Sequence, residues 1–223
     1  MMETNQYSLI ALLTLTAFIP FLVAAGTCYI KFSIVFVLIR NALGIQQVPS
    51  NMTLNGIALF LALFVMMPVI QKGYEQYQAE HVQLNSVESI IEFSDTGLSG
   101  YRAYLKKYSD PELLNFFEKA QAGRLDESHR DNVTTPNEPS IVALLPAYAL
   151  SEIKAAFKIG FYLYLPFIVV DMVISSVLLA LGMMMMSPVT ISVPVKLILF
   201  VAMDGWTLLS KGLVMQYIDL AKT

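Results

Sequence analysis

Hydrophobic residues are gathered into four long runs along this chain of 223 residues. The runs cover residues 9–30, 54–70, 159–181 and 194–218, and a polar stretch at 71–140 separates the first pair from the second. About 20 consecutive apolar residues allow an α-helix to cross the hydrocarbon core of a bilayer. The pattern therefore predicts an all-α protein with four hydrophobic helical segments that read as membrane spans, and a polar helical insert.

The same pattern predicts three regions in chain order. Residues 1–70 would form an N-terminal hydrophobic helical hairpin, and residues 71–140 a polar, mostly helical insert. The insert would end in a flexible linker at 124–140, where charged residues and two prolines gather. Residues 141–223 would form a C-terminal hydrophobic hairpin with a methionine-containing turn.

The two N-terminal runs differ in strength. Residues 9–30 carry no charge and are long enough to span. A cleaved signal peptide is the alternative, but the preceding residues include no lysine or arginine and the apolar run is longer than usual, so we favour a retained segment. Residues 54–70 contain Asn55 and Pro68, which makes this run of 17 residues marginal as a span.

Two helices are predicted within the insert. The second would begin at a capping box formed by Ser109 and Glu112, with Pro111 in its first turn, and would stop at Gly123. The first is indicated by side chains at helical spacing. These are Leu98, Tyr101, Leu105 and Tyr108.

Helical spacing also organises the C-terminal region. A helix is expected to resume after Pro146 and to run directly into the apolar segment at 159–181. We expect a single last helix over 194–218. At about 100° per residue, that helix would place Lys196, Asp204 and Lys211 within about 80° of arc, as one polar stripe.

Composition supports association with a membrane. Hydrophobic residues make up 56% of the chain and charged residues only 14%, whereas soluble domains have about 25% charged residues. Of the 31 charged residues, 19 lie between Lys72 and Glu138. The small net charge of −3 argues against nucleic acid as a main partner.

Motifs for catalysis or for cofactors are not found. The chain has no phosphate-binding loop of the Gly-x-x-x-x-Gly-Lys-Ser/Thr type, and His81 and His129 are isolated from each other and from Cys28. We therefore predict no enzyme activity, no catalytic residues, no bound metal and no cofactor. Any work in which the chain takes part would be powered elsewhere.

Charged residues inside the hydrophobic segments or directly next to them are the first functional candidates. They are Lys31, Asp171, Lys196, Asp204 and Lys211. Such a residue at the centre of a lipid-facing helix costs about 2.5–3.5 kcal/mol, so it usually faces a bundle interior, a cavity or an opposite charge. We expect buried charge pairing that supports assembly, with Asp171 bonded to Lys196 or Lys211 across helices or subunits. A transport pathway or a proton relay is the alternative role.

Four consecutive methionines, Met183, Met184, Met185 and Met186, are the second candidate. They stand between Gly182 and Pro188, where the chain is expected to reverse. The methionine thioether is flexible and polarisable, so it fills irregular gaps and repacks readily. Such a run can be filler in an apolar interior. Its position at a turn favours a soft apolar constriction, that is, a gate.

Two blocks of sequence resemble the SctR/FliP family of export-gate proteins, which serve type III secretion and flagellar export. The resemblance is closer to the injectisome branch, which is SpaP-like, than to the flagellar branch. The N-terminal block includes Gly26-Thr27-Cys28, Lys31-Phe32, Arg40-Asn41-Ala42-Leu43-Gly44 and Gln47-Val48-Pro49. The C-terminal block includes Ala156-Phe157-Lys158-Ile159-Gly160, Leu165-Pro166-Phe167, Asp171, Leu181-Gly182, the four methionines with Ser187-Pro188, Ile191-Ser192, Pro194, Lys196-Leu197 and Asp204-Gly205-Trp206.

The resemblance implies a function and an architecture. Family members are core pore-forming subunits that form a pentameric helical ring with small export-apparatus proteins of the SctS and SctT families and a SctU-type switch protein. Their helices fold as bent hairpins, and the assembled ring projects to the periplasmic side of the bacterial inner membrane within the needle-complex base. Unfolded polypeptides pass through it. The methionine loop of the family is a gasket, which here implies that role for Met183 to Met186.

Two other functions rest on the acids alone. A proton-coupled transporter would use Asp171 and Asp204 as a relay, but no inverted repeat is visible and the spans are few. An intramembrane aspartic protease would use the same two acids, but Asp204-Gly205 lacks a Gly-x-Gly-Asp setting. Both rank below an export gate.

Overall fold

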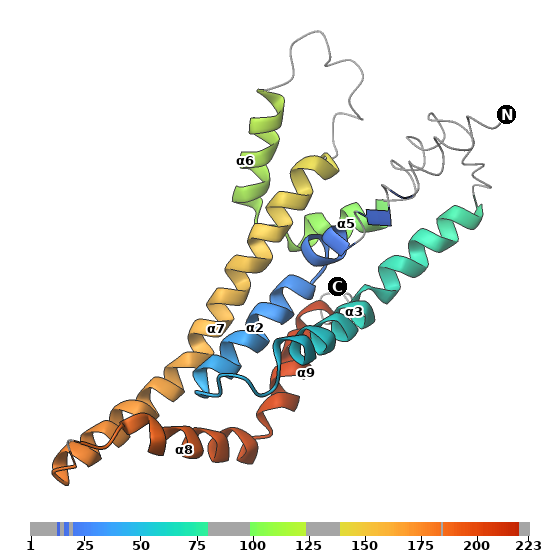
Figure 1. The fold of residues 1–223 in the computed structure, drawn as a ribbon. Coiled ribbons are helices and arrows are strands. Elements are labelled where there is room, and N and C mark those ends of the chain that lie inside the picture. The colour runs from blue at the N-terminus through green and yellow to red at the C-terminus, as the bar shows by residue number, and fades with distance from the viewer. Residues whose placement is uncertain are drawn as a thin grey trace. The chain divides into compact units, whose positions relative to one another are not determined.

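The computed structural model of the chain describes residues 13, 16, 17, 20–79, 99–123, 139–183 and 185–218, and over these residues it contains helices and no strand. The predicted all-α class is therefore confirmed for the described part of the chain. The principal helices, shown in Figure 1, are α2 (Tyr29–Ala42), α3 (Asn51–Ala79), α5 (Ser99–Tyr108), α6 (Pro111–Ala122), α7 (Ile141–Ala180), α8 (Pro188–Ala202) and α9 (Gly205–Ile218).

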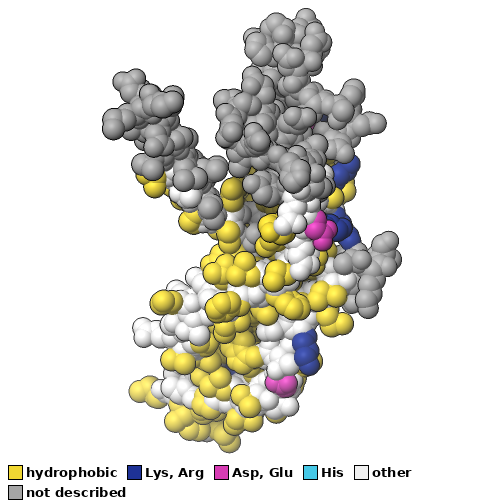
Figure 2. Space-filling model, turned by 90° about the vertical axis from the view of Figure 1, so that its right-hand side faces the viewer, with side chains coloured by type: hydrophobic (Ala, Val, Ile, Leu, Met, Phe, Trp, Pro, Cys, Tyr) yellow, Lys and Arg dark blue, Asp and Glu magenta, His cyan; other side chains and the backbone are white. Residues whose placement is uncertain are grey.

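Among the residues that the structure describes, two helices are long and apolar enough to cross a membrane, and the number of candidate spans rises to four if each bent helix pair counts as one. The single-helix candidates are Asn51–Glu75 on α3 and Ile141–Ala180, which is the whole of α7. Only 28% and 11% of their most apolar windows are buried within the chain. Most of their apolar surface is thus left for lipid or for other proteins to cover, and Figure 2 shows hydrophobic side chains spread over one face.

The structure corrects the expected bounds of both N-terminal hydrophobic segments. The second span, Asn51–Glu75, is 25 residues long rather than 17, because the helix extends beyond the apolar run at both ends. The first hydrophobic run, 9–30, does not form one helix that ends near residue 30. A short helix over Pro20–Gly26 stops, and α2 then begins at Tyr29. The part of the first run before residue 20 lies mostly outside the described residues.

The expected last helix over 194–218 is instead two helices. α8 begins at Pro188, six residues earlier than predicted, and the chain bends by 59° between α8 and α9. Pro194 lies inside α8 and does not start it. The prediction of one straight polar stripe along this segment is therefore wrong.

The described residues fall into two compact units. One draws on Met1–Ile30 and Met66–Glu152, and the other on Lys31–Val65 and Ile153–Thr223. We call them the first and the second unit. α3 and α7 each contribute residues to both units.

Tyrosines hold the first unit together. The Tyr101 hydroxyl donates to the Gly26 carbonyl at 2.8 Å, and the Tyr104 and Tyr148 hydroxyls are 2.7 Å apart. Tyr148 is fully buried. Because buried polar groups are costly without partners, these bonds fix α5 against the start of α7.

The start of α6 differs in detail from the predicted capping box. Asp110, and not Ser109, is the N-cap, and its carboxylate accepts a hydrogen bond from the Glu112 backbone N–H at 3.0 Å. Ser109 donates its hydroxyl to the Leu105 carbonyl at 2.7 Å instead. Pro111 in the first turn was predicted correctly. The linker predicted at 124–140 lies almost wholly outside the described residues.

Aromatic side chains build the core of the second unit. Buried Phe200 on α8 contacts Phe167 on α7, with ring centroids 6.4 Å apart, and Trp206 on α9, with centroids 5.3 Å apart in an edge-to-face geometry. Such pairs contribute about 0.5–1.5 kcal/mol beyond their buried area. Buried Ile39 on α2 and buried Leu43, which directly follows α2, complete the core.

Candidate functional site

The methionine run lies in the connection between α7 and α8, as the sequence predicts. α7 ends at Ala180 and α8 begins at Pro188, so residues 181–187 form a turn that we call the methionine turn. Figure 1 shows the chain reversing there. The turn belongs entirely to the second unit.

A Schellman motif fixes the entry to the methionine turn. Gly182 has a φ of +74°. The Met183 N–H donates to the Leu178 carbonyl at 3.0 Å, and the Gly182 N–H donates to the Leu179 carbonyl at 3.0 Å. This pair of bonds satisfies the last carbonyls of a helix and needs a residue that tolerates the left-handed conformation.

The exit from the turn is also defined. Ser187 is the N-cap of α8 and Pro188 occupies its first turn, where proline suits the helix because its missing N–H would have no partner. Thr190 donates its hydroxyl to the Ser187 carbonyl at 2.7 Å. The methionines are therefore presented from a short turn with a fixed backbone at each end.

The methionine side chains of this turn are exposed within the single chain. Met183 and Met186 are 39% and 44% exposed, and Met185 is fully exposed. Met184 lies outside the described residues. Met183 and Met186 are thus partly covered by the chain itself, whereas Met185 has no cover within it.

Lys196 and Asp171 form a charge pair between two apolar helices. The Lys196 Nζ on α8 donates to Asp171 Oδ2 on α7 at 2.6 Å, and also to the carbonyl of Ala42 at 3.3 Å. Ala42 ends α2, where unpaired carbonyls carry a partial negative charge. The Lys196 side chain is 7% exposed and that of Asp171 is 45% exposed. The lysine thus joins α2, α7 and α8 at one point.

A glycine lets α8 approach the end of α2. Gly44, with a φ of +78°, follows α2, and a Cβ placed on it would lie 2.5 Å from Val193 Cγ2 on α8. Nearby, Arg40 donates from Nη1 to the Pro49 carbonyl at 3.1 Å, which closes the turn between α2 and α3. Because Val193 and Lys196 both belong to α8, the contact with α2 holds the helix that begins at the methionine turn.

Asp204 lies in the bend between α8 and α9. It adopts a φ of 51°, and its N–H donates to the Val201 carbonyl at 3.0 Å while its carboxylate accepts from the Thr207 hydroxyl at 2.9 Å. Aspartate tolerates this conformation better than most residues. Asp204 is exposed within the chain, and its assembly pairing remains a prediction.

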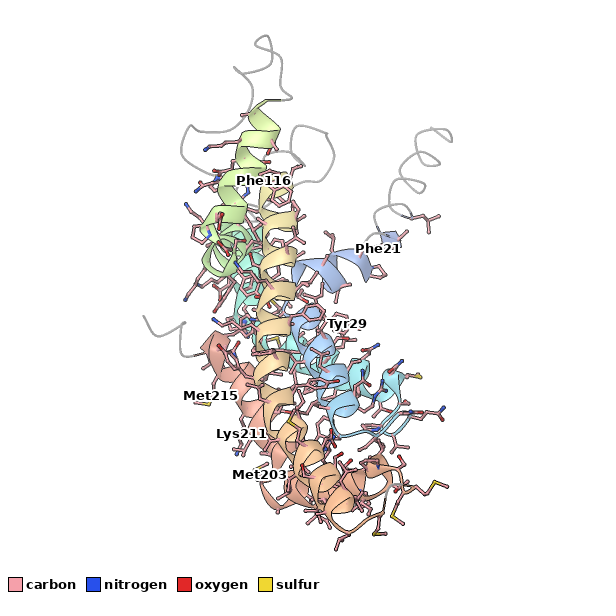
Figure 3. The ribbon with its side chains drawn as sticks, turned by 90° about the vertical axis from the view of Figure 1, so that its left-hand side faces the viewer. Phe21, Tyr29, Phe116, Met203, Lys211 and Met215 are labelled. Atoms are coloured by element: carbon pink, nitrogen blue, oxygen red, sulfur yellow. The ribbon has the colours of Figure 1, made fainter. Side chains whose placement is uncertain are left out.

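The two remaining predicted charges have different surroundings. Lys31 on α2 is 5% exposed, and its Nζ lies 4.6 Å from the ring centroid of Tyr217 on α9, a geometry in which the ring face attracts the cation. Lys211 is exposed on α9 and projects from it in Figure 3. Of the two lysines proposed as partners of Asp171, the structure brings Lys196 to it.

Comparison with known proteins places these features in a family. The FliP family profile matches residues 12–213. The surface presentation of antigens protein SpaP of Salmonella typhimurium is 62% identical over 221 residues, which are 97% of this chain and 99% of that protein. The chain belongs to the FliP family.

Further relatives agree with the assignment to the FliP family. SpaP of Shigella flexneri is 63% identical over 216 residues, covering 97% of this chain and 98% of that protein. The Yop proteins translocation protein R of Yersinia pestis is 45% identical over 213 residues, covering 96% and 97%. The resemblance inferred from the motifs, including its SpaP-like branch, is confirmed. The family match includes the methionine turn and the charge pair.

Sequence reasoning missed three contributors to this site. The Ala42 carbonyl could not be predicted as a partner of Lys196, because every residue has a backbone acceptor and the sequence does not show which one is used. The packing of Phe167 against Phe200 was not singled out, although both are aromatic residues in apolar helices. The bend at Asp204 could have been predicted from the pair Asp204-Gly205, since both residue types are enriched where φ is positive. Among the described residues, no cluster of His, Cys, Asp and Glu could hold a metal ion.

Proposed function

We propose that this chain is a core pore-forming subunit of a type III protein secretion export apparatus in the bacterial inner membrane. It would gate the passage of unfolded polypeptides into the needle complex, and Met183, Met184, Met185 and Met186 would form the gasket. The observation that carries the proposal is the exposed methionine turn, held by a Schellman motif at one end and an N-cap at the other. Membership in the FliP family, and relatives named for surface presentation and translocation, support it.

The mechanism follows from the chemistry of thioethers. Methionines from several subunits would meet at the pore axis and form a dry plug that resists ions and small solutes. A polypeptide driven from the cytoplasm would displace them, because unbranched side chains change rotamer at low cost and repack around different shapes. The fixed backbone at both ends of the turn would return the plug to its closed state.

Other subunits of the assembly would cover the apolar helix surfaces that are exposed in the single chain. We propose a pentameric ring of this chain with small SctS-type and SctT-type proteins and a SctU-type switch protein, projecting to the periplasmic side of the membrane. The low burial of the most apolar windows of α3 and α7 supports extensive contacts outside the chain. Lipid would cover what remains.

The gasket is tested by replacing all four methionines with alanine in the assembled complex. The closed pore should leak more small solute, because each substitution removes most of an apolar side chain from the plug. Met215→Ala is the matched control, since Met215 is also exposed but lies on α9. Leakage that stays at the level of the unmodified protein and of this control would contradict the gasket assignment.

The oligomeric state is tested by the native mass of the chain in mild detergent, alone and co-expressed with its candidate small partners. A defined ring that gains mass with the partners is the expected result. A stable monomer under both conditions would contradict the proposed assembly, and it would favour the transporter hypothesis based on Asp171 and Asp204.

A further inference from the structure

Arg40 is a buried cation in the second unit, and the described part of the chain supplies no anion for it. It lies in the last turn of α2 and is 7% exposed. Its Nη1 donates to the Pro49 carbonyl at 3.1 Å, and its Nε is buried without an acceptor. No carboxylate among the described residues pairs with it. A buried charge without an opposite charge is costly, so we expect an anion from outside the chain at this point.

The start of α3 adds a second positive feature at the same place. Pro49, the acceptor of the Arg40 bond, stands directly before the turn residue that leads into α3 at Asn51. The N–H groups of Asn51 and Met52 have no acceptor among the described residues. Such N–H groups carry a partial positive charge and attract anions. We call the Arg40 guanidinium together with these two N–H groups the basic corner.

The acids of the second unit narrow the choice of anion. Its described residues include two carboxylates, those of Asp171 and Asp204. Asp171 is bonded to Lys196 at 2.6 Å. Asp204 is exposed, and the Thr207 hydroxyl donates to its Oδ1, so Oδ2 has no partner in the described part of the chain. Arg40 therefore lacks an anion and Asp204 lacks a cation, and the two are not paired within one chain.

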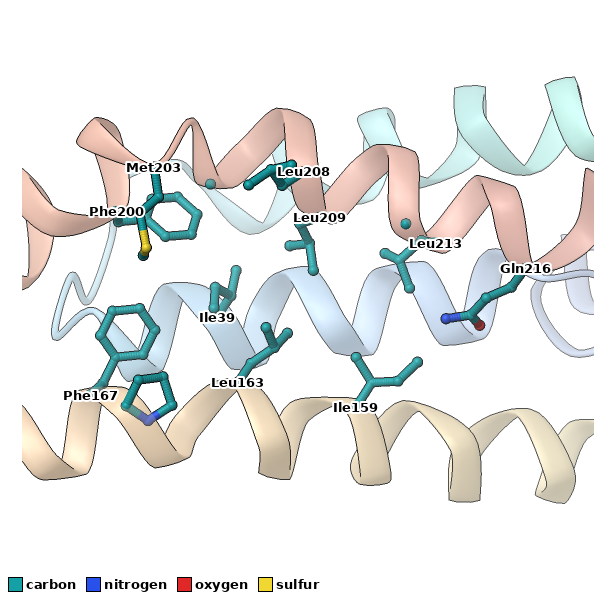
Figure 4. Close-up of a pocket in the computed structure, with 13 residues that line it drawn as sticks. Ile39, Ile159, Leu163, Phe167, Phe200, Met203, Leu208, Leu209, Leu213 and Gln216 are labelled. Carbon is teal, nitrogen blue, oxygen red and sulfur yellow. The ribbon is translucent and has the colours of Figure 1, made fainter.

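The bend between α8 and α9 leaves Asp204 outside the apolar groove beside it. Phe200 and Met203 lie on the α8 side of the bend, and both line the groove between α2, α7 and α9. Figure 4 shows their side chains directed toward α2 and α7. Asp204 is not one of the lining residues. The neighbouring apolar side chains thus point inward, while the carboxylate is free to meet another molecule.

The surroundings of the acid and of the basic corner resemble each other. Exposed apolar side chains flank Asp204, namely Val201 and Leu208. Exposed apolar side chains also flank the basic corner, namely Val48 and Met52. Contact between the two surfaces would bring opposite charges together inside an apolar rim. Such a rim excludes water and strengthens the attraction.

We propose that Asp204 of one copy of this chain binds the basic corner of the next copy. Its carboxylate would accept from the Arg40 guanidinium, whose planar donors match a carboxylate, and the first N–H groups of α3 would add to the attraction. The acid and the basic corner are different surfaces of one chain, so the contact is head-to-tail and its repetition builds a ring or a helical array. The contact rests on the proposed ring of copies, but it does not involve the methionine turn.

Cysteine cross-linking tests this contact without changing either charged residue. Val48→Cys places a thiol beside the basic corner, and Val201→Cys places one beside Asp204, whose N–H donates to the Val201 carbonyl at 3.0 Å. The two valines are 69% and 72% exposed. Cys28 is the single native cysteine and is buried, so a short bis-maleimide should react with the new thiols. The chain with both substitutions, assembled with its candidate partners, should give a ladder of dimers, trimers and larger products on a denaturing gel.

Three controls define the geometry of the contact. Either single-cysteine variant alone should give no product, and the two single variants co-expressed should give dimers only. Phe60→Cys combined with Val201→Cys is the matched control, because Phe60 is 73% exposed on α3 but lies more than two helical turns from the basic corner. This pair should give no ladder. Dimers alone from the Val48→Cys, Val201→Cys chain would mean a two-fold contact and would overturn the head-to-tail arrangement.

A double-mutant cycle tests the charges, with the fraction of chain in the ring measured by native mass. Asp204→Asn and Arg40→Gln should each lose most of the ring, and the double variant should lose no more than the worse single variant, because both remove one contact. Asp204 is exposed, so loss of the ring in Asp204→Asn with an unchanged melting temperature excludes misfolding. Losses that multiply in the double variant would show that Arg40 and Asp204 bind different partners, which overturns the proposal.

Failure of this contact can be told apart from failure of the proposed function. A ring that forms in the unmodified protein but gives no ladder through positions 48 and 201 would overturn the pairing and leave the proposed ring standing. A ring that persists in Asp204→Asn and is lost in Arg40→Gln would mean that an acid of another subunit type fills the basic corner. Absence of any ring in the unmodified protein would overturn both the pairing and the proposed assembly.

Discussion

The Lys196 ammonium lies 2.6 Å from the Asp171 carboxylate and 3.3 Å from the Ala42 carbonyl, so one cation joins α2, α7 and α8. The two partners are unequal in exposure, at 7% for the lysine side chain and 45% for the aspartate. Lys196 therefore bears most of the cost of desolvation, and the backbone carbonyl of α2 satisfies a second of its donors. The half-exposed carboxylate retains room for a further contact from outside the chain.

Reversal of either charge should destabilise the second unit and block assembly. Removal of one partner of a buried pair costs about 3–5 kcal/mol, and the exposure of Asp171 lowers the expected cost to about 1–3 kcal/mol. Asp171→Lys and Lys196→Asp should each lower the melting temperature and the yield of assembled complex. Combining the two should restore assembly only in part, because an aspartate at position 196 cannot donate to the Ala42 carbonyl.

Lys211 provides the control for this exchange. It is exposed on α9, and Lys211→Asp should lower the melting temperature little, since exposed charges contribute at most about 1 kcal/mol. Rescue of Lys211→Asp by Asp171→Lys, with no rescue of Lys196→Asp, would show that the functional pair is the other one that the sequence allowed.

Gly182→Ala should weaken closure of the proposed gate by displacing the methionine turn. Gly182 has a φ of +74° and a Cβ there would meet nothing within 4 Å, so the cost comes from the backbone alone, about 1–2 kcal/mol. Asparagine tolerates this conformation, so Gly182→Asn should have a smaller effect. Solute leakage through the assembled pore should rise in the order glycine, asparagine, alanine. Gly56→Ala, in open space on α3, should not leak.

Much of this arrangement could be predicted from local patterns. The methionine turn followed from Gly182 and Pro188, and the all-α class followed from long apolar runs. Contacts between residues far apart in the sequence were harder to predict. The sequence predicted that Asp171 pairs with either Lys196 or Lys211, because both lysines lie on apolar segments. Only the packing of α8 against the end of α2 shows which of the two lysines is the partner. The N-cap of α6 is Asp110 and not the predicted Ser109, because the Ser109 hydroxyl donates to a carbonyl of the preceding helix, α5.

Asp204 can be tested for its local function separately from its charge. Its φ of 51° and its bond to Thr207 predict that Asp204→Asn keeps the bend, because asparagine accepts the same hydrogen bond and tolerates the conformation. Asp204→Val should cost about 1–2 kcal/mol, since a β-branched side chain is disfavoured where φ is positive. Thermal unfolding in detergent measures both.

The asparagine variant also tests the predicted assembly pairing of Asp204. Normal yield of the assembled complex with Asp204→Asn would remove this residue from the set of paired charges. A variant that melts like the unmodified chain but fails to assemble would show that the carboxylate charge is used between subunits. The valine variant cannot make this distinction, because it disturbs the bend itself.

The first unit should lose stability at alkaline pH through its buried tyrosines. Burial raises the pKa of Tyr101 from 10.0 to about 12, and burial likewise raises the pKa of Tyr104. The folded-state pKa thus exceeds the unfolded value, so the stabilising contribution is complete below about pH 10 and is lost as the pH rises toward 12. Melting temperatures of the full-length protein in detergent, measured from neutral pH upward, should fall steeply in that window.

Tyr101→Phe should make this alkaline fall shallower, because one group that ionises more readily in the unfolded state is gone. At neutral pH the same variant should be less stable by about 0.5–1.5 kcal/mol, since the hydroxyl no longer donates to the Gly26 carbonyl. Tyr162→Phe is the control for removal of a tyrosine hydroxyl, because Tyr162 is 59% exposed on α7 and lies outside the first unit. Equal slopes for all three proteins between pH 10 and 12 would show that Tyr101 ionises with equal ease in the folded and unfolded states, contrary to its burial.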